Sequence, residues 1–172
     1  MNTTSLQPPW APSAEAAAPL ADYRLALAGD TQRALARGWL YLGLVALIGS
    51  GLFSLLLVLA RTPGVNAWLP AADFFRVALV VHVDLSVLVW FSAIAGMLWS
   101  LNASARAAIW SWVALGLCSA GALLMSAAAF VSPGTPIMAN YIPVLDSALF
   151  HAGLVIFGLG AAVQVQIGRA HV

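Results

Sequence analysis

Four long apolar runs alternate with short polar segments along the chain. Each run is close to or above the roughly 20 residues that an α-helix needs to cross the hydrocarbon core of a bilayer. Glycine, proline, asparagine and arginine gather between the runs, where they are typical of turns. The pattern predicts an all-α membrane protein with four transmembrane helices, at about residues 38–60, 74–101, 107–131 and 147–166.

The segment before the first run has a different composition. Residues 1–18 are rich in alanine, proline, serine and threonine and carry a single charge, which predicts a flexible tail. Residues 19–37 mix apolar positions with Arg24, Arg33 and Arg37. They form either an interfacial helix leading into the membrane or a partly ordered juxtamembrane arm.

Composition supports a membrane location. The chain is 62% hydrophobic and 8% charged, whereas soluble domains have roughly 25% charged residues. A chain so poor in charge cannot cover itself with polar surface in water. It has no lysine and no basic cluster, so we expect the lipid bilayer as a partner and no nucleic acid. The single cysteine, Cys118, excludes a disulfide framework and a cysteine-based metal site, and it fits a packing role.

The arginines predict the orientation of the chain in the membrane. Four of them fall on one predicted side and two on the other: Arg24, Arg33, Arg37 and Arg106 against Arg61 and Arg76. Because cytoplasmic loops carry the excess of positive charge, the N-terminus is predicted to be cytoplasmic.

The second run contains two ionisable residues, His82 and Asp84. Such residues are costly at membrane depth and are functional candidates by default. In the predicted orientation His82 lies about 12 Å from the outer face, at 1.5 Å rise per residue. Small residues share its side of the helix, which allows close approach by another helix or a flat ligand. Asp84 points about 200° away from His82 at 100° per residue, so it needs a partner other than His82, a water-filled space or a proton. Its role is either in a proton path or in helix packing or cavity lining.

A neutral imidazole in an apolar helix can have one of two roles. It can ligate a metal, including a haem iron, while its other ring nitrogen is held by a hydrogen bond. Alternatively, it is a structural histidine bonded to a carbonyl or hydroxyl group of a neighbouring helix. His151, at the start of the fourth run, is a weaker candidate because an interfacial histidine costs little.

The second run also carries a family resemblance. FFRVALVVHVDLSVLVWFSAIAGMLWSL, at residues 74–101, resembles the second transmembrane helix of subunit I of the haem–copper oxidase superfamily, and most closely the divergent bacterial cytochrome c oxidase subunit I-like members. LLLVLARTPG and NYIPVLDSALFHAGLVIFGLGA support the resemblance, which covers about residues 38–166. In that family this helix carries one axial histidine of the low-spin haem near the outer face, which implies that His82 is that ligand.

The resemblance implies a function for the intact protein. It would take electrons from cytochrome c or a quinol through the low-spin haem to a haem–copper centre. That centre would reduce oxygen to water, coupled to proton translocation across the bacterial inner membrane, together with other oxidase subunits. A nitric oxide reductase-type member of the same superfamily is the alternative within this class.

The chain departs from the family in length. The family has about twelve helices, and its second low-spin haem ligand, high-spin haem ligand and copper ligands lie on later ones. After His82 only His151 and His171 remain, and neither matches a later metal motif. We therefore expect an N-terminal fragment that is inactive alone, with the high-spin haem and copper only in the missing part. Residues 167–172, IGRAHV, match one frame of a common sequencing adapter, so we expect them to be non-native.

Two further classes stay open at this point. One is a non-catalytic haem-binding bundle, which would need His151 to face His82. The other is a structural or transporter bundle without a cofactor. Gly116–Ala120 and Gly158–Ala162 are small-xxx-small pairs, which predict close packing of the third and fourth helices in any of these classes.

Overall fold

The computed structural model describes residues 29–70, 73–102, 104, 107–138 and 141–169. The predicted tail at 1–18, residues 19–28 of the predicted arm, Arg106 and residues 170–172, including His171, lie outside the described residues.

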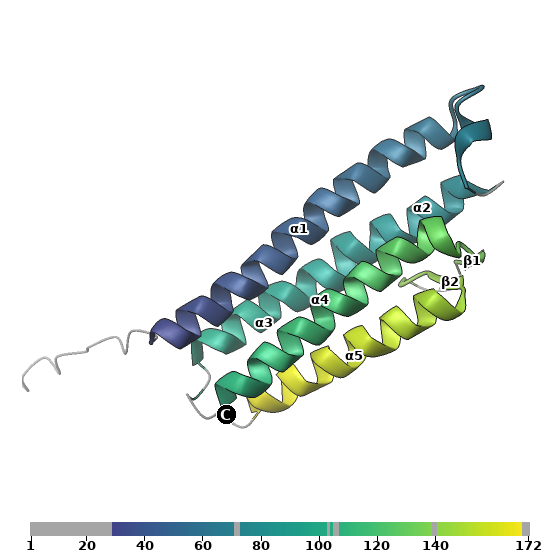
Figure 1. Cartoon of the computed structure of the whole chain (residues 1–172). Coiled ribbons are helices and arrows are strands. Elements are labelled where there is room, and N and C mark those ends of the chain that lie inside the picture. Colours follow the sequence, from purple (N-terminus) through teal and green to yellow (C-terminus); the bar gives the residue numbers. More distant parts are fainter. Residues whose placement is uncertain (1–28, 71–72, 103, 105–106, 139–140, 170–172) are drawn as a thin grey trace, which may run out of the picture.

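Four long helices make up the described structure (Figure 1). The first is α1 (Asp30–Ala60). The second is a continuous helix made of α2 (Phe74–Val83), η3 (Asp84–Val89) and α3 (Trp90–Asn102). The third and fourth are α4 (Ala108–Val131) and α5 (Ala148–Arg169). Each of the four is long and apolar enough to cross a membrane, which confirms the predicted number of spans and indicates a multi-pass membrane protein.

The first helix starts earlier than the hydrophobic pattern indicates. α1 begins at Asp30, so residues 30–37 are its first turns and continue directly into the apolar span. The amide of Arg33 bonds to the carbonyl oxygen of Gly29 at 3.0 Å, and Asp30 places a negative charge at the positive end of the helix dipole. The later part of the predicted arm is therefore helical and continuous with the first span.

A small β-hairpin interrupts the all-α arrangement between α4 and α5. Strands β1 (Thr135–Ile137) and β2 (Val144–Asp146) are antiparallel, with Thr135 opposite Asp146. Gly134 makes the turn after α4 with φ +60°, a conformation that residues with a Cβ rarely adopt. The apolar pattern could not predict this pairing, because each strand has only three residues.

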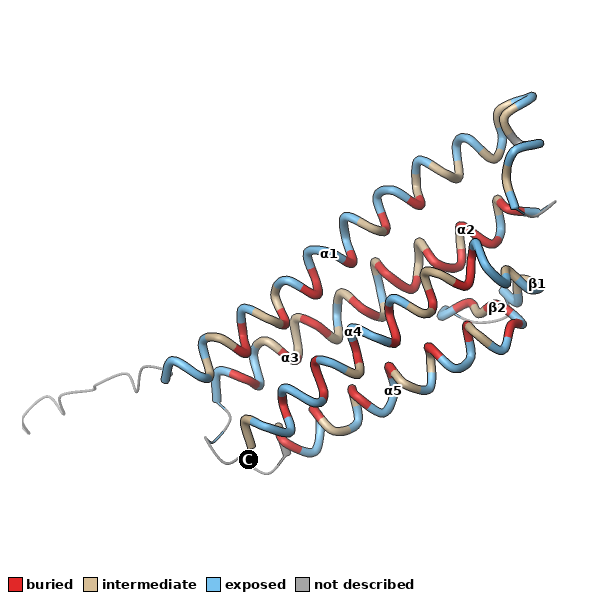
Figure 2. Tube along the Cα trace, viewed as in Figure 1, coloured by how far each residue is buried: buried red, intermediate tan, exposed pale blue. Residues whose placement is uncertain are grey.

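The helices pack as two pairs around a common core. α1 lies along α2–η3–α3, and α4 lies along α5 (Figure 1). Buried residues follow the facing sides of the helices, and exposed residues follow the outer sides (Figure 2). Phe130 of α4 joins the two pairs, since its ring centroid lies 5.7 Å from that of Phe53 in α1 and 5.8 Å from that of Phe74 in α2.

α4 and α5 approach each other through glycines, but not through the predicted ones. A Cβ added at Gly121 would lie 2.5 Å from the amide nitrogen of Phe157, and one added at Gly160 would lie 2.8 Å from the carbonyl oxygen of Ala114. By contrast, a Cβ at Gly116 or Gly158 would meet nothing within 4 Å in the described structure. The close packing of these helices is confirmed, but the pairs Gly116–Ala120 and Gly158–Ala162 lie on exposed sides and do not form this contact.

Candidate functional site

His82 lies near the end of α2, half-buried and turned toward α1. Its Nδ1 atom is 2.9 Å from the backbone carbonyl oxygen of Ser50 and 2.9 Å from the Ser50 hydroxyl oxygen. The same hydroxyl group is 3.0 Å from the carbonyl oxygen of His82. The imidazole ring is thus held against the middle of α1 by one residue.

This set of contacts selects one tautomer of the ring. A carbonyl oxygen can only accept, so the bond to the Ser50 carbonyl is made by the tautomer in which Nδ1 is protonated and donates. The Ser50 hydroxyl then donates to the His82 carbonyl oxygen, so Nδ1 and the Ser50 hydroxyl each have an acceptor. The assignment follows from the hydrogen-bond network. It leaves the lone pair of Nε2 available to a ligand.

The helix changes its winding directly after His82. Residues Asp84–Val89 form a π-helical segment, η3, a feature that is rare and often found at functional sites. The Ser86 hydroxyl donates to the His82 carbonyl oxygen at 2.7 Å. With Ser50, two hydroxyl groups bond this one carbonyl, which stabilises a position where the regular hydrogen-bond ladder changes.

Nε2 of His82 has no hydrogen-bond partner within the part of the chain that the structure describes. His151, the other described histidine, is an exposed residue of the first turn of α5, and its ring contacts the edge of Phe150 at 6.5 Å. No hydrogen bond or ring contact joins it to His82. Among the described residues, no three His, Cys, Asp or Glu side chains gather in a group that could hold a metal ion. His82 is therefore a single candidate ligand among the residues that the structure describes.

Two small residues on the side of His82, Ala93 and Gly96, are covered by α1. A Cβ at Gly96 would lie 2.5 Å from the ring of Trp39, and one at Gly43 of α1 would lie 3.3 Å from the Cβ of Ala93. Ala78 and Ala93 are fully buried. The small residues on this side predicted close approach either by another helix or by a flat ligand, and the approach of a helix is confirmed. A flat ligand would have to approach His82 from outside the α1 contact.

Asp84 is buried inside the bundle, away from the contact between His82 and Ser50. Its residue is 2% exposed, and neither carboxyl oxygen has a hydrogen-bond partner among the described residues. Two other acidic residues form ion pairs at the starts of helices, Asp30 with Arg33 and Asp73 with Arg76. The sequence showed that Asp84 needs a partner or water, and the described residues supply no partner.

Sequence reasoning missed Ser50 as part of the site. The available signal was weak, since Ser50 is one of two serines in an otherwise apolar run and nothing local marks it as facing His82. Only the packing of α1 on α2 brings these residues together, across 32 positions of sequence.

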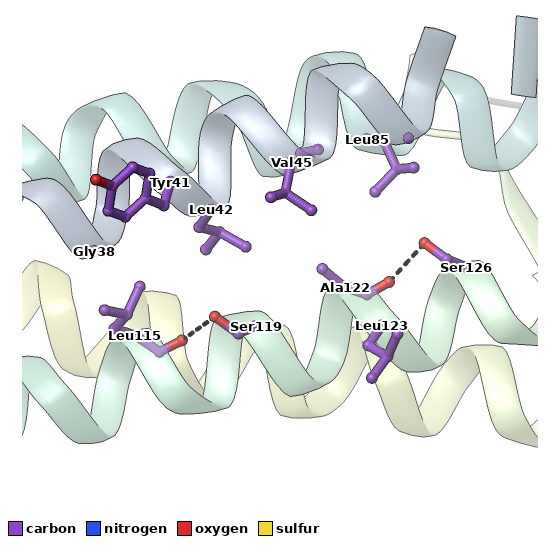
Figure 3. A pocket seen from close by; sticks show the side chains of 12 residues that line it. Gly38, Tyr41, Leu42, Val45, Leu85, Leu115, Ser119, Ala122, Leu123 and Ser126 are labelled. Atoms are coloured by element: carbon purple, nitrogen blue, oxygen red, sulfur yellow. Dashed lines mark hydrogen bonds between the residues drawn. The ribbon is translucent and has the colours of Figure 1, made fainter. Parts of the chain in front are cut away.

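A second feature is a groove between α1 and α4 with a volume of about 460 Å³ (Figure 3). The hydroxyl groups of Ser119 and Ser126 are bonded to their own helix, at the carbonyl oxygens of Leu115 and Ala122, each at 2.8 Å. Tyr41 adds a third hydroxyl group to the lining. Apart from these hydroxyl groups the wall of the groove is apolar, and His82 does not line it.

Comparison with known proteins finds longer relatives of unstated function. An uncharacterised protein of Rickettsia prowazekii (strain Madrid E) is 39% identical over 72 residues, covering 42% of this chain and 14% of the relative. An uncharacterised protein of Aquifex aeolicus (strain VF5) is 29% identical over 122 residues, covering 71% of this chain and 31% of the relative. No family model and no solved structure matches the chain. The chain matches less than a third of the length of either relative.

Proposed function

We propose that this chain forms the first membrane helices of a haem–copper oxidase-like subunit and that His82 is an axial ligand of its low-spin haem. The observation that carries the proposal is the hydrogen bond from Nδ1 of His82 to the carbonyl oxygen of Ser50, at 2.9 Å. Metal-ligating histidines almost always donate their second ring N–H in this way. The bond fixes the ring and leaves Nε2 free to bind iron.

The residues of this chain fit one half of a haem site. His82 would supply one axial nitrogen, and the backbone of Ser50 would orient the ring. A haem bound between two axial ligands supplies one-electron transfer. The second axial ligand would come from a segment beyond the described residues, since His151 is exposed on α5.

The wider function rests on the resemblance of residues 74–101 to the oxidase family. In this proposal the complete subunit takes electrons from cytochrome c or a quinol and delivers them to a haem–copper centre that reduces oxygen. The subunit lies in the bacterial inner membrane with the N-terminus in the cytoplasm. The greater length of both relatives is compatible with such a larger subunit.

The test is a haem spectrum of the purified chain. The chain is expressed in bacteria supplied with a haem precursor, and reduced-minus-oxidised spectra are recorded for wild type, His82→Ala and His151→Ala. We expect His82→Ala to lose the haem signal and His151→Ala to retain it. A wild-type signal that survives in His82→Ala would overturn the ligand assignment, and so would a wild-type chain that takes up no haem even with imidazole added as a second ligand.

A further inference from the structure

A small, partly open cavity lies between the helices at the end of the bundle that contains the start of α4. It measures about 100 Å³ and is lined by residues of all four helices, among them Trp39, Ser92, Cys118 and Gln164. The liquid volume of a water molecule is about 30 Å³, so the cavity has room for about three. Its lining residues include no charged side chain.

Two of the lining side chains carry buried polar atoms without partners. Trp39 is 1% exposed and its indole N–H has no acceptor, and Gln164 is 2% exposed and its Oε1 atom has no donor. Both belong to the wall of the cavity. The two side chains that carry this donor and this acceptor thus border the same small space.

The remaining bonds of Gln164 are also incomplete. Its Nε2 atom is 3.4 Å from the carbonyl oxygen of Gly96 and 3.5 Å from the hydroxyl oxygen of Ser100. Both distances exceed the usual range of about 2.7–3.2 Å for an N–H···O bond. The Ser100 hydroxyl already donates to the Gly96 carbonyl oxygen at 2.7 Å. The whole amide group of Gln164 is therefore poorly satisfied by protein atoms.

A third unpartnered group lies at the same level. Gly160 of α5 packs against Ala114 of α4. One turn closer to this end of the bundle, α5 carries Gln164 and α4 carries Ser111. Ser111 is completely buried, and its hydroxyl group has no partner among the described residues. Three groups without partners are thus concentrated in one layer of the bundle.

We infer that this cavity is an internal water site, in which water molecules bond the indole N–H of Trp39 and the amide group of Gln164. Buried water molecules typically bond about three otherwise unsatisfied polar groups, which matches the groups collected here. An acyl chain would leave all of them unbonded, and an ion would find no charged side chain. This inference is independent of haem binding by His82.

Hydroxyl-radical labelling by X-ray radiolysis tests the inference on the full chain in membranes. Radicals form from water, so side chains that contact internal water are oxidised even where bulk solvent is excluded. Trp39 and Cys118 both line the cavity and are buried. Met125 is equally buried, has an oxidisable sulfur and lies outside the cavity lining, so it is the matched control.

We expect Trp39 and Cys118 to be oxidised several-fold faster than Met125. Rates for both that are as low as that of Met125 would show a dry cavity and overturn the inference. A second variant, Ala95→Leu, fills the cavity from its wall and should reduce the labelling of Trp39 and Cys118. Labelling that is unchanged in folded Ala95→Leu would mean that radicals arrive by another route, which also overturns it.

Discussion

The carbonyl oxygen of Ser50 and the Nδ1 atom of His82 lie 2.9 Å apart and join the first two membrane helices. The acceptor is a backbone atom, so its position depends on the packing of α1 and not on the identity of the side chain. The hydroxyl group of Ser50 makes separate contacts, to Nδ1 and to the carbonyl oxygen of His82. The orientation of the ring and the hydroxyl bonds can therefore be tested separately.

Ser50→Ala removes the hydroxyl group but keeps the carbonyl that orients His82. We expect haem binding to persist, with a loss of about 1 kcal/mol in the free energy of unfolding from the lost hydrogen bonds. Ser86 continues to bond the His82 carbonyl oxygen in this variant. The measurements are the haem spectrum and thermal unfolding in detergent. The control is Ser119→Ala, whose hydroxyl group bonds only its own helix.

A different result for Ser50→Ala would change the account of the site. Loss of the haem spectrum to the same degree as in His82→Ala would show that the hydroxyl group, and not the backbone carbonyl, orients the imidazole. An equal loss in Ser119→Ala would indicate general instability.

The close contact between α4 and α5 predicts that two glycines of α4, Gly121 and Gly116, respond differently to substitution by alanine. Gly121→Ala places a Cβ 2.5 Å from the Phe157 amide nitrogen and 2.6 Å from the Gly153 carbonyl oxygen, so the helices must separate. We expect a loss of about 1–3 kcal/mol in unfolding free energy, the usual cost of overpacking. Gly116→Ala meets no atom within 4 Å and should be neutral or gain up to about 1 kcal/mol from helix propensity.

Thermal unfolding of both variants in the same detergent measures the difference. Equal stability of Gly121→Ala and Gly116→Ala would contradict the close contact of α4 with α5. A loss in Gly116→Ala alone would mean that this exposed side of α4 is covered by something outside the described residues.

The proposed orientation can be tested with single cysteines. The connection between α1 and α2 and the β-hairpin lie at one end of the bundle (Figure 1), and Ser104 lies at the other. Trp68 and Tyr141 are 90% and 99% exposed. We expect Trp68→Cys and Tyr141→Cys to react with a membrane-impermeant maleimide added to spheroplasts, and Ser104→Cys to react only after lysis. The reverse pattern would place the N-terminus outside.

Native Cys118 does not interfere with that experiment. It is fully buried, and its thiol contacts the Phe157 carbonyl oxygen at 3.6 Å. The wild-type chain should therefore remain unlabelled before and after lysis, which provides the background for the three variants.

The fold was predictable where one physical requirement dominates. Spanning a bilayer demands long apolar helices, and the four runs satisfied that demand within a few residues, except that α1 extends back to Asp30. Packing partners were not predictable, because any small residue can face either a helix or lipid. Gly116 and Gly121 are alike in sequence, yet only Gly121 faces α5. The same limit hid Ser50, since its role depends on which turn of α1 meets His82.

Asp84 gives the last prediction, because its carboxyl group is buried without a partner among the described residues. An unsatisfied buried polar group costs about 1–3 kcal/mol. Asp84→Val removes that group without adding side-chain atoms, so we expect it to raise the unfolding free energy by about that amount. Asp84→Asn keeps a polar group in the same place and should give no such gain. Thermal unfolding in detergent measures both, and the haem spectrum should be unchanged because His82 faces α1. Destabilisation by both substitutions would show that the carboxyl group has a partner beyond the described residues, and would identify Asp84 as a bonded member of a larger assembly.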